Sequence, residues 1–171
     1  MHKKVFTNKR VLIATGIAAL LFLFMLVYSP GKNIIGSPET GVYSYIKEIE
    51  RNPTSFSVVI TDSNPGIADD FSKKFGIDKI KFDYDQELSN GLIIVGINNR
   101  LAKELMGDYY LNGGEALIRL YPTNGGYVLV VAGESERDTI EGLDILKNYR
   151  VYQKQLGEMG VVLSNGKLII A

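Results

Sequence analysis

The sequence contains no cysteine and only one histidine, His2. Without cysteine, the chain cannot form disulfides, ligate an iron–sulfur cluster, build a cysteine zinc site or use a thiol nucleophile. Because His2 lies in the basic N-terminal tail, the folded part of the chain has no imidazole to act as a general base or as a metal ligand. The serines and threonines therefore have no histidine partner for a catalytic triad.

Two phosphate-binding motifs are also missing. Neither G-x-G-x-x-G nor G-x-x-x-x-G-K-[ST] occurs, although Gly66, Gly96 and Gly133 each follow a predicted strand. Ligands do bind beyond the carboxyl ends of strands in open α/β sheets. Glycine is equally used to turn a strand into a helix, and that interpretation is favoured here. Asn52-Pro53-Thr54 has a proline at its middle position, so N-glycosylation is not predicted.

No excess of charge points to nucleic acid as a partner, because 19 basic residues balance 19 acidic ones. The charge is unevenly distributed along the chain. The first ten residues carry Lys3, Lys4, Lys9 and Arg10 and no acidic residue. The remaining 15 basic residues face all 19 acidic ones, so the rest of the chain is slightly acidic.

An apolar run from Val11 to Tyr28 follows the basic tail without a charge or a proline. As a helix it would span about 27 Å, close to the roughly 30 Å thickness of a bilayer's hydrocarbon core. We predict a basic cytoplasmic tail over 1–10, a transmembrane signal anchor over 11–29 and a linker over 30–36, with the C-terminal domain outside the cell membrane. A cleaved signal peptide and a buried core helix are the alternatives.

Residues 37–171 predict an extracytoplasmic α/β domain in which helices and strands alternate before two hairpins. A helix is expected to begin at Ser37-Pro38 and end at Asn52-Pro53, with Val42, Tyr45, Ile46 and Ile49 on its apolar face. The other expected helices end near Phe75, Gly107 and Tyr149. Strands are expected at Phe56–Thr61, Asp78–Phe82, Leu92–Val95, Ala116–Tyr121, Tyr127–Ala132, Val161–Ser164 and Lys167–Ile170.

Asn124-Gly125-Gly126 and Asn165-Gly166 each separate two of these strands and predict β-hairpins. Antiparallel pairs joined to alternating strands and helices indicate a mixed sheet. The predicted fold class is therefore α/β, a three-layer-like mixed sheet with helices packed on it and a C-terminal hairpin, preceded by one transmembrane helix.

A strand, a glycine turn and a helix are predicted over residues 127–147. Ser135 can serve as N-cap, with Asp138 three residues later as in a capping box. Ile140, Leu143 and Leu146 fall three residues apart and predict the buried face of the helix.

Acidic residues offer three weaker candidate sites. Asp83, Asp85 and Glu87 alternate and would place oxygen ligands for calcium on one side of an extended segment, although a solvated connector is the favoured interpretation. Asp69-Asp70 and the pair Glu134 and Glu136 could act as acid–base carboxylates. Both pairs lie in predicted first helical turns, where carboxylates are favoured by the helix dipole.

Residues 91–162 resemble the outer-domain module of archaeal S-layer proteins. The resemblance comprises a strand with Val-Gly and an asparagine, a Glu-Ala-x-Ile-x-Leu strand, and Val-Ala-Gly followed by Asp-Thr and a distant tyrosine. The matching positions are Val95, Gly96, Asn99, Glu104, Leu105, Glu115, Ala116, Ile118, Leu120, Val131, Ala132, Gly133, Asp138, Thr139, Leu146 and Tyr149. Two departures are Ile97-Asn98, where the family has Gly-Pro, and Gly142, where it has alanine.

Together with the predicted anchor and the missing catalytic groups, the resemblance predicts a non-enzymatic, membrane-anchored envelope protein. No cofactor and no metal site is predicted. Gly96, Asn99, Gly133, Asp138 and Thr139 would be structural residues of its motif, and S-layer or other envelope proteins would be its partners. The alternative is a membrane-anchored domain that binds or senses a small ligand through loops 62–66, 96–99 and 133–136. That alternative predicts a pocket where these loops meet.

Overall fold

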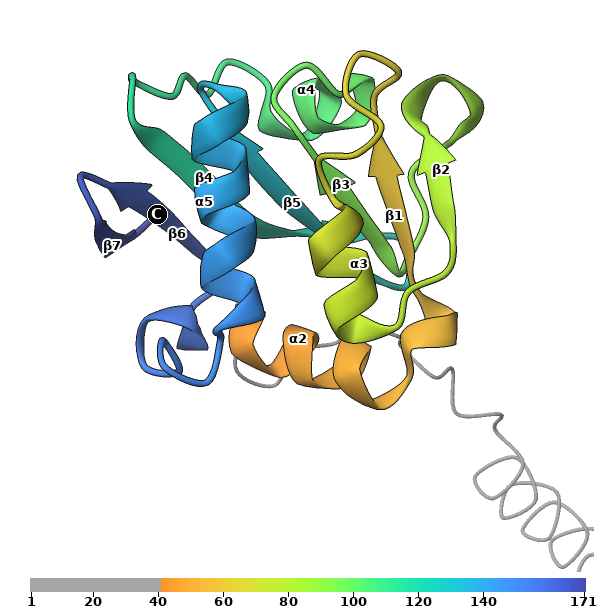
Figure 1. Cartoon of the computed structure of the whole chain (residues 1–171), viewed down its shortest axis with the longest axis horizontal. Coiled ribbons are helices and arrows are strands. Elements are labelled where there is room, and N and C mark those ends of the chain that lie inside the picture. Colours follow the sequence, from red (N-terminus) through yellow and green to blue (C-terminus); the bar gives the residue numbers. More distant parts are fainter. Residues whose placement is uncertain (1–40) are drawn as a thin grey trace, which may run out of the picture. The chain divides into compact units, whose positions relative to one another are not determined.

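The computed structural model describes residues 41–171, in which helices alternate with strands and two hairpins are separated by a helix (Figure 1). The elements are α2 (Val42–Arg51), η1 (Pro53–Ser55), β1 (Ser57–Ile60), α3 (Asp69–Phe75), β2 (Ile80–Phe82), η2 (Asp83–Asp85), β3 (Leu92–Val95), α4 (Arg100–Met106), β4 (Glu115–Thr123), β5 (Gly126–Gly133), α5 (Glu136–Lys147), η3 (Gln155–Gly157), β6 (Gly160–Ser164) and β7 (Lys167–Ile170).

The strands of the described residues form one seven-stranded mixed sheet in the order β2-β1-β3-β5-β4-β6-β7. The first four strands in this order are parallel, and β4, β6 and β7 continue the sheet through antiparallel pairs. The predicted α/β class, the mixed sheet and both hairpins are therefore confirmed.

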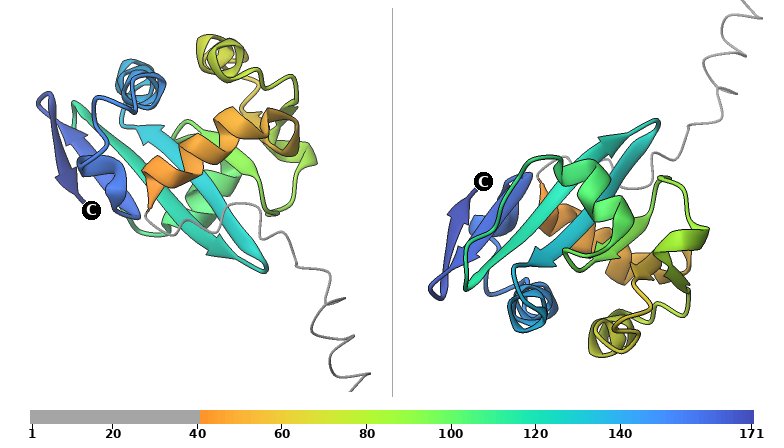
Figure 2. Two further views of the ribbon diagram at one scale, coloured as in Figure 1. Left: turned by 90° about the horizontal axis from the view of Figure 1, so that it is seen from below. Right: turned by 90° about the horizontal axis from the view of Figure 1, so that it is seen from above.

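Helices pack on both faces of the sheet, so each face closes its own hydrophobic core (Figure 2). Helices α2, α3 and α5 cover one face, where their apolar side chains meet Val58, Ile93 and Val131. Helix α4 packs on the other face against Ile94 and Val130. The central strands β1, β3 and β5 are buried on both faces, which explains their uninterrupted apolar sequences.

Helix α2 begins at Val42, so the predicted start at Ser37-Pro38 is wrong. Gly41 precedes the helix with a positive φ of 83°, and a Cβ there would lie 2.2 Å from the carbonyl oxygen of Gly157. The chain passes so close to the η3 segment that the Val42 amide donates to the Glu158 carbonyl at 2.9 Å. This long-range contact, which has no local sequence signal, fixes where α2 starts.

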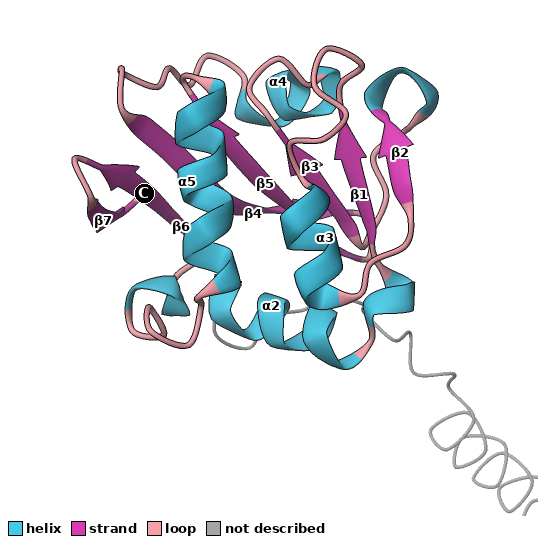
Figure 3. Cartoon of the chain, viewed as in Figure 1, coloured by secondary structure: helices cyan, strands magenta, loops and turns pink. Residues whose placement is uncertain are grey.

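None of the helices within residues 41–171 is long and apolar enough to cross a membrane (Figure 3). The predicted tail, anchor and linker over 1–36 lie outside the described residues, as do Ser37 to Thr40. The described residues belong to one compact unit of the chain.

Candidate functional site

The loops that follow β1, β3 and β5 meet at one edge of the sheet, because carboxyl ends of parallel strands lie together. They surround an open cavity of about 200 Å³. The cavity is lined by Thr61, Ser63, Asn64, Ile67, Gly96, Ile97, Asn98, Glu134, Ser135, Glu136 and Thr139. The pocket expected where loops 62–66, 96–99 and 133–136 converge is thus present.

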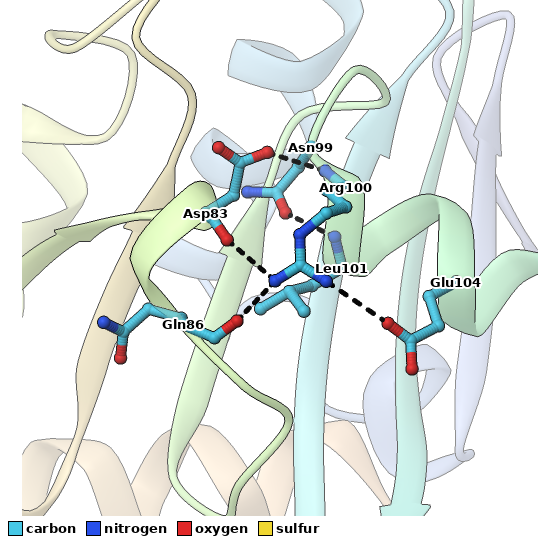
Figure 4. A network of polar contacts seen from close by, with 6 residues as sticks. All are labelled: Asp83, Gln86, Asn99, Arg100, Leu101 and Glu104. Atoms are coloured by element: carbon cyan, nitrogen blue, oxygen red, sulfur yellow. Dashed lines mark hydrogen bonds and ion pairs between the residues drawn. The ribbon is translucent and has the colours of Figure 1, made fainter.

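Asn99, the neighbour of the cavity residue Asn98, is fully buried and joins three elements. Figure 4 shows its bond to Leu101 at the start of α4. Its Nδ2 donates to the carbonyl of Val59 in β1 at 3.1 Å and approaches that of Val95 in β3 at 3.5 Å. Its Oδ1 accepts from the Leu101 amide at 3.0 Å and so caps α4. Both ends of the amide are used within the fold, and none of these bonds reaches toward a ligand.

Asp83 and Arg100 form a second contact at the start of α4 (Figure 4). The Arg100 amide donates to Asp83 Oδ2 at 2.7 Å, and its guanidinium donates to the carbonyls of Asp83 and Gln86. The guanidinium also lies 3.6 Å from Glu104. These bonds tie the segment after β2 to α4. Sequence analysis missed this pair, because residues 17 positions apart carry no local signal.

The extended segment that a calcium site at Asp83, Asp85 and Glu87 would require does not form. Residues Asp83–Asp85 form the 3₁₀ helix η2, so these carboxylates do not line one side of a strand. The Asp83 carboxylate is already bonded to the Arg100 amide. Across residues 41–171 there is no cluster of three or more side chains suited to hold a metal ion.

Gly133 ends β5 in close contact with the first turn of α5. A Cβ at Gly133 would lie 2.2 Å from the Thr139 amide nitrogen, so the position has no room for a side chain. The Gly133 amide donates to Thr139 Oγ1 at 2.9 Å, and that hydroxyl donates to the Ser135 carbonyl at 3.0 Å. Thr139 is 1% exposed and closes the turn from inside.

Ser135 and Asp138 form the predicted capping box. The Asp138 amide donates to Ser135 Oγ at 3.2 Å, and the Ser135 amide donates to Asp138 Oδ2 at 3.1 Å. The Ser135 hydroxyl donates to the same carboxylate oxygen at 2.7 Å. This hydroxyl bond is the main reason that the pKa of Asp138 lies below its usual value, against an opposing effect of burial.

The amides of this turn are used by the protein itself. Gly133 and Ser135 donate to side chains of α5, and Glu134 donates to the Glu115 carbonyl at 3.0 Å. After β3, the Gly96 amide donates to the Val131 carbonyl at 2.9 Å. A phosphate-binding loop needs such amides to point at its ligand. Together with the nearby Glu134 and Glu136, this pattern disfavours an anionic ligand.

The candidate carboxylate pairs are exposed, at or just before the first turns of two helices. Asp69 and Asp70 occupy the first turn of α3, as predicted, and line a groove of about 350 Å³ between α3 and α5. Glu136 borders both this groove and the cavity at the sheet edge, whereas Glu134 borders the cavity alone. Asp69, Asp70 and Glu136 lie in first helical turns, where the helix dipole stabilises carboxylates. Glu134 precedes the N-cap Ser135, so its predicted place in the first turn of this helix is wrong.

Comparison with known proteins assigns no family to the chain: no protein-family model matches it, and no curated protein is significantly similar to it.

Proposed function

We propose that the protein is a membrane-anchored, extracytoplasmic structural or interaction protein of the cell envelope that resembles a single S-layer outer-domain module. One observation carries this proposal. The five motif residues, Gly96, Asn99, Gly133, Asp138 and Thr139, all bond or pack within their own fold. A binding or catalytic motif would instead direct some polar groups toward a ligand.

The proposal includes no catalytic role. The folded part of the chain has no cysteine or histidine, and its candidate acid pairs are exposed. A general acid or base is normally tuned by burial or by a charged neighbour, and neither Asp69-Asp70 nor the Glu134 and Glu136 pair is buried.

Membrane extraction tests the anchor. Membranes carrying the full chain are washed with alkaline carbonate or high salt, and we expect the protein to stay in the pellet. A matched variant with Leu20→Arg and Leu21→Arg places two charges in the apolar run, each costing about 2.5–3.5 kcal/mol of insertion free energy at a helix centre. We expect this variant to be released. Release of the unaltered chain by either wash would refute the anchor.

Amine-reactive, membrane-impermeant cross-linking of intact cells tests the envelope role. We expect the chain to be linked to an envelope protein, and the link to be lost in the Leu20→Arg, Leu21→Arg variant. Recovery of the unaltered chain without any linked envelope protein would contradict the proposed role.

Binding of a small ligand is the second candidate function, and the cavity at the carboxyl ends of β1, β3 and β5 is the observation that favours it. Its volume of about 200 Å³ is below the roughly 300–1,000 Å³ of most ligand pockets. Thermal melting with a panel of calcium, amino acids and sugars tests this function. A rise in melting temperature that the cavity-filling Asn98→Trp variant abolishes would favour the second candidate over the first.

A further inference from the structure

Strand β7 ends the sheet and presents an apolar edge. It is the last strand in the sheet order and lies at the outer edge, beyond β6 (Figure 1). Within it, Ile169 is 57% exposed and Ile170 is 66% exposed. An edge strand has backbone N–H and C=O groups without a partner strand, and these can hydrogen-bond to a strand of another chain. Exposed apolar side chains on the edge strand favour such pairing.

The pairing with β6 shows which backbone groups of β7 are unpaired. The Ala171 amide donates to the Gly160 carbonyl at 3.0 Å, and Ile170 lies opposite Val161. Because hydrogen-bonded and non-bonded pairs alternate in antiparallel strands, Lys167 and Ile169 also direct their backbone groups toward β6. The amides and carbonyls of Leu168 and Ile170 therefore point away from the sheet.

The opposite edge, β2, differs from β7. Its three residues include Lys81, and Lys79 precedes them directly. Lysines on an edge strand discourage pairing with another chain. In β7 the only charge is Lys167, at the start of the strand, and the three residues after it are aliphatic.

We propose that β7 pairs antiparallel with β7 of a second copy of this chain, about a twofold axis at Ile169. In this register Leu168 of each copy lies opposite Ile170 of the other, which gives two hydrogen-bonded pairs. The outward amide and carbonyl of Leu168 and of Ile170 are then all hydrogen-bonded. The two copies of Lys167 lie at opposite ends of the interface, each facing Ala171, so like charges are kept apart.

The apolar rows of the sheet continue across this interface. On the α4 face, Leu117, Val162 and Ile169 are consecutive cross-strand neighbours, and Ile169 would meet its own copy. On the other face, Ile118, Val161 and Ile170 form a second row, which would lead to Leu168 of the partner. A self-complementary patch of this kind is the basis of a twofold dimer.

A single cysteine tests the register, because the natural chain has none. In the full chain carrying Ile169→Cys, the two thiols would face each other in a non-bonded pair with Cα atoms about 4.5 Å apart, within disulfide range. Mild oxidation should give a covalent dimer on a non-reducing gel. The matched control is Ile80→Cys on edge strand β2, where the side chain is 42% exposed.

A charge swap tests the same contact without covalent chemistry. Ile169→Lys and Ile169→Glu should each sediment as monomers, because like charges would face each other, and mixing the two should restore a dimer. Ile80→Lys should leave the dimer intact. Three outcomes would overturn the proposal: a monomeric unaltered chain, a dimer that survives Ile169→Lys, or cross-linking no faster at 169 than at 80. None of these results depends on the envelope function.

Discussion

Gly133 is a residue at which any side chain would collide with the backbone of the next element. Its backbone is extended rather than left-handed, so the requirement comes from the 2.2 Å approach to the Thr139 amide. We expect Gly133→Ala to lower the free energy of unfolding by about 1–3 kcal/mol or more through overpacking. Urea denaturation measures the change. Gly113→Ala is the control, because a Cβ there meets nothing within 4 Å, and equal effects at both sites would contradict this account.

Asp138 gives the capping box a dependence on pH. Because its pKa in the folded protein is depressed, the ionised carboxylate stabilises the fold above the unfolded value of about 3.9, and this stabilisation is lost as the pH falls through the folded pKa. We expect Asp138→Ala to lower the free energy of unfolding by about 0.5–2 kcal/mol at pH 7, as for other capping residues.

Urea unfolding measures the free energy of unfolding of the natural chain and of Asp138→Ala at about pH 7, 5 and 3. As for other paired carboxylates, the difference between the two proteins should be the same at about pH 7 and 5 and smaller at about pH 3. Asp108→Ala, at an exposed loop position, should have little effect at any of these values. A difference between the natural chain and Asp138→Ala that stays constant down to the lowest value would mean that ionisation of Asp138 contributes nothing.

At the scale of elements, Asn99 connects β1, β3 and α4. Asn99→Ala would remove the α4 cap and leave the Val59 carbonyl without its side-chain donor in a fully buried site. The two losses together should lower the free energy of unfolding by about 2–4 kcal/mol. Asn98→Ala is the adjacent control, because Asn98 is exposed, and a chemical denaturation curve distinguishes them. A loss at Asn99 no larger than at Asn98 would rule out the connecting role.

Helix α5 illustrates how far periodicity predicts an element. The capping box and the buried Leu143 and Leu146 were predicted from spacing alone, and both are confirmed. Ile140 was predicted to be buried and is 40% exposed, so that part is wrong. The helix is rotated so that Thr139 and Gly142 face the sheet instead.

The buried face of α5 differs from the predicted one because the helix lies close to the sheet. A Cβ at Gly142 would lie 3.1 Å from Val131 Cγ1 and 3.3 Å from the Ala116 Cβ. Position 142 therefore needs a small residue. It is glycine in this chain, and the S-layer pattern has alanine there. Spacing identifies apolar positions, but it does not reveal that a glycine and a threonine can form the contact face when the helix lies close to its strands.

For the whole molecule, the sequence predicts the elements better than their neighbours in space. Local patterns of turns and apolar runs are enough to predict the two hairpins and the buried strands. The parallel order β2-β1-β3-β5 depends on long-range pairing, as do the start of α2 at Gly41 and the contact between Asp83 and Arg100. Hydrogen bonds between residues that are distant in the chain leave no periodic pattern in the sequence. At the candidate site, these bonds determine which polar groups are available to a ligand.

The orientation of the whole chain gives the last prediction, and the absence of cysteine makes it testable. The basic flank of the apolar run predicts a cytoplasmic N-terminus, and this orientation would put residues 37–171 on the other side of the membrane. Tyr110 is 84% exposed, so a Tyr110→Cys variant carries an accessible thiol in the domain. A membrane-impermeant maleimide added to intact cells should label this variant but not Lys3→Cys. Labelling of Lys3→Cys should require lysis, because its thiol would face the cytoplasm. The reverse pattern would place the domain inside the cell and remove the basis for an envelope role, while leaving the β7 pairing to be judged on its own tests.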